Sequence, residues 1–209
     1  GIPCFMIAYL ARYAVYHVIK KRAFNDGFIL TPTLFEGIKE NWLKALLSGL
    51  VMGLSSMALQ VGGVFLFTNF DNNIYLGLGL GFLIIQFFFL FMMNEYTMVS
   101  SPIYILKWHK QLKNGFLFTF IDLLINLAYF IVVITGPFAL SIIHPIAYII
   151  VVFVFLLFVT PLSMIFFSLR SHFIFDNFLN KEQHPEIYRK GLFVEETNVE
   201  EENNGESSN

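Results

Sequence analysis

The stretch IYLGLGLGFLIIQFFFLFMM, residues 74–93, holds twenty residues without an Asp, Glu, Lys or Arg. The hydrocarbon core of a bilayer is about 30 Å thick and a helix rises about 1.5 Å per residue, so about 20 apolar residues are needed to cross it. The stretch therefore predicts a transmembrane helix. Its one carboxamide side chain is Gln86.

Four further runs, which are mostly apolar, predict four more spans. The last of these runs has thirty uncharged residues, more than a membrane requires, so we start its helix at the first-turn proline Pro145 and expect Pro161 to kink it. Because the chain begins with Gly1 inside an apolar run, we interpret the first span as the second part of a longer helix. The four additional spans are 2–18, 45–68, 116–135 and 145–168.

The composition agrees with a lipid environment. Of 209 residues, 56% are apolar and 13% are charged, which leaves too little polar surface to cover a soluble globule of this size. There is no broad basic face of the kind that nucleic-acid binding requires. The single cysteine, Cys4, excludes an internal disulfide and a cysteine-based zinc site.

The basic residues predict the orientation of the chain. They gather in every second connection and after the last span, whereas the connections 69–73 and 136–138 contain none. Short cytoplasmic loops carry the excess of Lys and Arg, so the pattern predicts a cytoplasmic C-terminus, and Arg12 is expected to snorkel to the same side. The residues concerned are Lys20, Lys21, Arg22, Lys39, Lys44, Lys107, Lys110, Lys113, Arg170, Lys181, Arg189 and Lys190.

Two cytoplasmic segments have apolar residues at helical spacing among lysines. Residues 35–44 and 103–113 each contain one of the two tryptophans, Trp42 and Trp108, which favour the membrane interface. The sequence thus predicts an all-α, polytopic membrane helix bundle of about five spans, with short amphipathic cytoplasmic helices, over residues 1–192. The acidic residues 193–209 predict a disordered cytoplasmic tail, because they contain too few hydrophobic residues to form a core.

Asp122 is the only acidic residue well inside a predicted span. Asn126 and Tyr129 follow at i+4 and i+7, so the three form one polar stripe. Burying a carboxylate in lipid costs at least about 2.5 kcal/mol, which makes Asp122 a candidate proton or substrate contact. The alternative, which we favour, is hydrogen bonding between helices or contact with interfacial water or Lys113.

Other polar and small residues predict helix packing. Gln60 and Gln86 stand alone among apolar neighbours and are expected to form hydrogen bonds across helices. Glu95 follows a predicted span and is expected to form a surface ion pair with the basic segment after it. Gly49 and Gly53 form a GxxxG pattern, which predicts close helix packing either within the chain or in self-association.

No enzyme signature stands out. The sequence contains no HExxH, GxSxG or P-loop motif and no paired carboxylates on one helix, and its five histidines are scattered. We therefore expect no catalytic residues, no cofactor and no metal site.

Four segments carry a family resemblance. They are GIPCFMIAYLARYAVYHVIKKR (1–22), FEGIKENWLKA (35–45), the Ser101-Pro102 turn before KWHKQLKNGF (107–116), and YRKGL (188–192). Residues 1–192 resemble the YesL-like family of small bacterial membrane proteins, a domain of unknown function. The chain departs from the family pattern at Ile7, where a Thr-Gly pair is expected after Pro3.

The resemblance implies a bacterial cell membrane and, because such proteins are often found beside carbohydrate uptake systems, an accessory role in sugar import. The first hypothesis is therefore a non-enzymatic accessory or regulatory component of solute transport that docks on a transporter permease. The alternative is a small oligomeric transporter or channel in which Asp122, Asn126 and Gln86 line a path. An intramembrane enzyme or lipid-handling protein is the third candidate, and it requires two ionisable groups at one depth.

Overall fold

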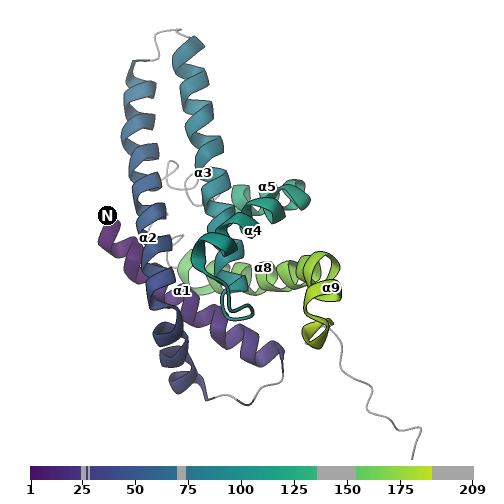
Figure 1. The fold of residues 1–209 in the computed structure, drawn as a ribbon. Coiled ribbons are helices and arrows are strands. Elements are labelled where there is room, and N and C mark those ends of the chain that lie inside the picture. The colour runs from purple at the N-terminus through teal and green to yellow at the C-terminus, as the bar shows by residue number, and fades with distance from the viewer. Residues whose placement is uncertain (25–26, 28, 70–73, 136–153, 190–209) are drawn as a thin grey trace, which may run out of the picture.

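The computed structural model describes residues 1–24, 27, 29–69, 74–135 and 154–189, and these residues form helices without strands (Figure 1). Four helical segments among them are long and apolar enough to cross a membrane, and a bent pair of helices provides a fifth if it counts as one span. The predicted all-α membrane bundle is therefore confirmed. The predicted tail 193–209 lies outside the described residues.

Helices α1 (Ile2–Ala23), α2 (Leu30–Thr68) and α3 (Ile74–Ser100) form the first half of the bundle. The predicted interfacial helix 35–44 and span 45–68 are one continuous helix of 39 residues, about 58 Å long. Gly37 does not break this helix, because α1 packs directly against it at His17. In Figure 1 the far ends of α2 and α3 extend beyond the other described helices as a hairpin.

Span three also continues further than predicted. The hydrophobic run ends at Met93, but α3 reaches Ser100 because residues 94–100 are buried against other helices. The helix stops where Pro102 disfavours helical geometry at the residue before it. The prolongation places Glu95 inside the bundle.

The fourth predicted span, 116–135, is not one straight helix in the structure. Helix α4 (Trp108–Ile121) begins earlier, and α5 (Leu123–Phe130) leaves it at an angle of 98°. The break lies at Asp122, and the π-helical segment η1 (Ile131–Thr135) follows α5. Because α5 runs nearly perpendicular to α4, the two make either a broken span or a re-entrant segment.

The fifth predicted span, 145–168, is placed only in its second half, since residues 136–153 lie outside the described part of the chain. A π-helical segment η2 (Phe155–Val159) leads into α8 (Thr160–Phe175), and Pro161 occupies the first turn of α8. The helical path continues beyond residue 168 as far as Gln183. It does so through η3 (Asp176–Asn180) and α9 (Lys181–Gln183), and the short 3₁₀ helix η4 (Pro185–Ile187) follows.

The small residues of α2 lie against α1, which runs antiparallel to it. A Cβ atom on Gly49 would lie 2.6 Å from the Cα of Met6, and one on Gly53 would lie 3.2 Å from the Cα of Ile2. The approach at Gly49 is closer than any side chain permits, and the one at Gly53 is tight. The GxxxG pattern, for which the sequence left two uses open, therefore forms an internal interface with α1.

Candidate intramembrane site

A buried ion pair joins α1 to α3. Arg12 Nη2 lies 2.5 Å from Glu95 Oε1, and the hydroxyl of Tyr16 donates to Glu95 Oε2 at 3.0 Å. The Glu95 side chain is fully buried and that of Arg12 is 20% exposed. Both expectations for these residues are therefore wrong: Glu95 is not in a surface pair, and the Arg12 guanidinium turns into the bundle because it has a carboxylate to bind there.

Aromatic side chains surround this pair. The guanidinium carbon of Arg12 lies 5.5 Å from the centre of the Tyr9 ring, a cation–π distance. Tyr129 of α5 interacts electrostatically with both Arg12 and Glu95. Its ring centre also lies 5.0 Å from that of Phe167 in α8. The pair thus sits where four helices meet, and no local motif in the sequence indicated it.

A second ion pair joins the break between α4 and α5 to α8. The Nε and Nη2 atoms of Arg170 donate to the two carboxylate oxygens of Asp122 at 2.5 and 2.7 Å. The exposed fractions are 31% for Arg170 and 11% for Asp122. Asp122 therefore contacts another helix, as the favoured alternative required, but its partner is Arg170 and not Lys113.

Asn126 bridges the same break. Its Oδ1 accepts from the hydroxyl of Tyr96 at 3.1 Å, and its Nδ2 donates to the carbonyl of Thr119 at 3.1 Å. Thr119 lies in the last turn of α4, where carbonyls lack partners within their own helix. The buried amide of Asn126 therefore stabilises the end of α4 and ties it to α3.

Gln60 and Gln86 are not brought into this site. Both side chains are exposed, one on α2 and the other on α3, in the part of the hairpin where Gly62 packs against Leu83. Neither amide has a hydrogen-bond partner among the described residues. The predicted hydrogen bonds across helices are thus not formed within the part of the chain that the structure describes, where both side chains are exposed.

Polar contacts also fix the end of the bundle that carries the basic segments. Lys44 Nζ donates to Ser101 Oγ at 3.0 Å, and Ser101 Oγ donates to Asn41 at 2.7 Å. The indole N–H of Trp108 donates to Ser48 at 3.0 Å. These contacts hold the loop after α3 against α2.

The C-terminal segment is anchored to the same loop. The Tyr104 hydroxyl donates to Asn180 Oδ1 at 2.5 Å, and Asn180 Nδ2 donates to Asp176 at 2.6 Å. Burial raises the pKa of Tyr104, so its hydroxyl stays protonated as this hydrogen bond requires. The backbone N–H of Arg189 also donates to Asp176, at 3.2 Å.

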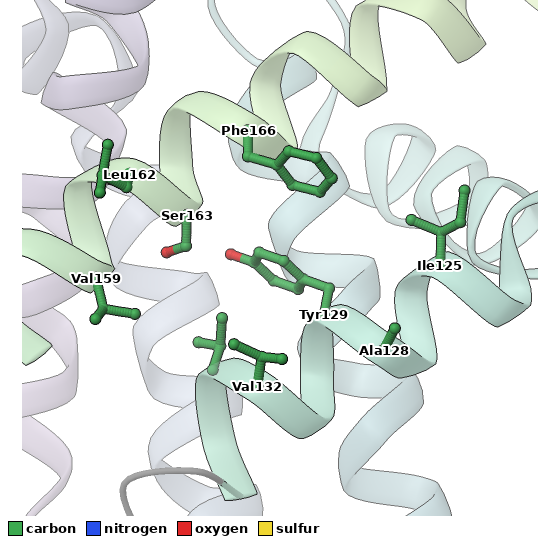
Figure 2. Close-up of a pocket in the computed structure, with 9 residues that line it drawn as sticks. Ile125, Ala128, Tyr129, Val132, Val159, Leu162, Ser163 and Phe166 are labelled. Carbon is green, nitrogen blue, oxygen red and sulfur yellow. The ribbon is translucent and has the colours of Figure 1, made fainter.

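A cavity of about 420 Å³ lies between α5–η1 and η2–α8. Figure 2 shows the hydroxyls of Tyr129 and Ser163 facing each other across it. Every other lining residue is apolar. These residues are Ile125, Ala128, Val132, Val133, Val159, Leu162 and Phe166.

Within the described ranges, no three His, Cys, Asp or Glu side chains are grouped to hold a metal ion. The absence of a metal site, of a cofactor and of catalysis stays a prediction for the chain as a whole. The chain matches no protein-family model, no curated protein and no solved structure. The resemblance to the YesL-like family is untested by these comparisons and stays a prediction.

Proposed function

We propose that this chain is a non-enzymatic component of a bacterial cell membrane that assists or regulates a solute transporter, with carbohydrate uptake as the candidate process. The observation that supports this proposal best is the pairing of Glu95 with Arg12 and of Asp122 with Arg170. Charges that neutralise each other within one chain hold helices together and leave no charged side chain of these pairs for a passing solute. A partner protein therefore has to bind at the outer faces of the helices.

The α2–α3 hairpin offers such a face. Gln60 and Gln86 are exposed there among exposed apolar residues such as Val61 and Ile85. An amide in hydrocarbon is stabilised by a hydrogen bond from a neighbouring helix, worth about 1 kcal/mol. A permease helix with a polar residue at the level of Gln60 or Gln86 would provide this hydrogen bond.

The orientation that we propose places the basic segments in the cytoplasm. Lys21 at the end of α1 contacts Glu36 near the start of α2 at 2.5 Å, and Lys44 of α2 contacts Ser101 after α3. The basic ends of α1 and α2 and the loop after α3, which leads to Lys107, therefore lie at one end of the bundle, as the positive-inside rule requires.

Cysteine labelling tests this orientation. In a Cys4→Ser background, a membrane-impermeant maleimide applied to whole cells is expected to label Asp71→Cys and to spare Lys110→Cys. Disruption of the cells should expose both positions, which serves as the control. Labelling of Lys110→Cys alone on intact cells would mean that the chain is inverted and that the basic segments face outward.

Co-purification tests the proposed partnership. The tagged chain, extracted from its native membrane in mild detergent, is expected to retain a transporter permease, and a deletion strain is expected to take up the solute more slowly. Loss of one hydrogen bond in Gln86→Leu should weaken the complex about fivefold, since it removes about 1 kcal/mol. Leu78→Ala, an exposed apolar change on the same helix, is the matched control. A partner-free protein together with unchanged uptake contradicts the proposal.

A second candidate function is a small oligomeric transporter or channel that uses Asp122 and Asn126. The 98° break at Asp122 favours it, because transporters build substrate sites from interrupted helices. The Asp122 variants discussed below separate this function from the first by measuring flux.

A further inference from the structure

The cavity between α5–η1 and η2–α8 is open at the outer face of these helices and closed by buried side chains on its inner side. Val132, Leu162 and Phe166 at its rim are between 54 and 65% exposed, whereas Tyr129 is 7% exposed. The volume of about 420 Å³ falls within the range of small-molecule sites. A ligand would therefore enter from the outer face of these helices and reach inward to Tyr129.

Tyr129 is the lining residue that favours a ligand with a polar group. Its hydroxyl is buried and makes no hydrogen bond of good geometry with the described residues. The polar groups within reach are Ser163 and Arg12. The Ser163 hydroxyl already donates to the carbonyl of Thr160 at 2.8 Å. The Tyr129 hydroxyl, which faces that of Ser163 between apolar walls (Figure 2), thus has no well-formed hydrogen bond of its own, and an unsatisfied donor there costs free energy.

The residues around Tyr129 indicate how deep its hydroxyl lies in the membrane. Tyr129 interacts electrostatically with Glu95, which lies near the C-terminal end of α3. The 98° bend at Asp122 carries α5 sideways from α4 instead of onward along it. Tyr129 therefore lies beside the C-terminal part of α3. In the orientation that we propose, this part of α3 is at the cytoplasmic membrane interface, the level of the lipid carbonyl oxygens.

We propose that this cavity binds one acyl chain, whose carboxyl or ester oxygen accepts a hydrogen bond from Tyr129. The apolar walls from Ile125 to Phe166 fit the hydrocarbon, and the two facing hydroxyls fit the single oxygenated end. A free fatty acid and a phospholipid share this chemistry. The Arg12–Glu95 pair interacts electrostatically with Tyr129, so the site borders the contact between α1 and α3.

Photocrosslinking of the purified full-length chain tests the proposal. Two probes are used separately: palmitic acid and phosphatidylcholine, each with a diazirine on an acyl chain. Saturable labelling is expected on the peptides that contain residues 123–133 and 157–166. Tyr129→Phe, which keeps the ring and removes the donor, should weaken labelling about fivefold. Labelling by the fatty acid alone or by the phospholipid alone identifies the source, and either result supports the site.

Ala128→Trp fills the cavity and should abolish labelling of these peptides. Because Ala128 is exposed, the larger side chain should not disturb folding. Leu124→Trp is the matched control, since Leu124 lies on the same helix, is 82% exposed and does not line the cavity. Labelling that spreads over α2 and α3 and is indifferent to both Ala128→Trp and Tyr129→Phe overturns the proposal. A disulfide between two copies of the chain that carry Leu162→Cys in the Cys4→Ser background would show that a second copy covers this face, and it also overturns the proposal.

Discussion

Replacing Arg12 by Met is expected to lower the free energy of unfolding by about 3–5 kcal/mol, because the carboxylate of Glu95 is left buried without a charged partner. Glu95 is 0% exposed and cannot recover the hydration that the ion pair replaces. Glu95→Leu should cost less than Arg12→Met, since the Arg12 side chain keeps 20% exposure and can turn toward water. Unfolding in mixed micelles, followed by the fluorescence of the two tryptophans, measures these changes.

The double variant Arg12→Met with Glu95→Leu distinguishes an unpaired charge from a packing defect. Replacing a whole buried ion pair by apolar side chains is often neutral or stabilising, so its stability is expected to lie close to that of the wild type. Lys21→Met is the control, because the exposed pair Lys21–Glu36 should contribute no more than about 1 kcal/mol. If the double variant were as unstable as Arg12→Met, the loss would come from packing and the pair would have no special role.

Asp122→Asn is expected to lower the free energy of unfolding by about 2 kcal/mol, because it removes a charge-assisted, bidentate interaction with Arg170. The effect should be smaller than that of Arg12→Met, since Arg170 is 31% exposed and water can reach it. Arg170→Lys keeps the charge but loses the two parallel hydrogen bonds, and it should fall between Asp122→Asn and the wild type. Lys113→Gln is the control, because Asp122 does not bind Lys113 in the structure.

The same variant separates the two candidate functions. In liposomes that contain the purified chain, an accessory component is expected to show no solute flux with or without Asp122→Asn. A transporter that uses Asp122 should show flux that this variant abolishes although the protein remains folded. Flux that is present and indifferent to Asp122→Asn would exclude a path through this residue.

Much of the fold could be predicted from the sequence because the membrane imposes a local requirement. A span must be about 20 apolar residues long, so the runs at 45–68 and 74–93 could be read directly and lie within α2 and α3. Helix ends were harder to place. The apolar run of span three stops at Met93, but buried polar residues prolong α3 to Ser100, and a hydropathy pattern does not distinguish a buried polar residue from one in water.

The polar site was predictable only in part. The spacing of Asp122, Asn126 and Tyr129 indicated one stripe, and the structure gives the three different roles: an ion pair, a cap on α4 and a cavity wall. For Gln60 and Gln86 the structure shows no partner among the described residues, since both side chains are exposed. A residue's identity indicates that it needs a partner, but it does not indicate on which side of a helix that partner lies.

By itself the sequence determined that this chain is built of membrane-crossing helices, because runs of apolar residues and their length are properties of neighbouring positions. Only the tertiary structure decided that Arg12 pairs with Glu95, that Asp122 pairs with Arg170, and that α1 packs closely against Gly49. These partners lie far apart in the chain, and the contacts depend on the angles at which helices cross. Such angles follow from the packing of whole helix surfaces, and no short stretch of sequence contains that information.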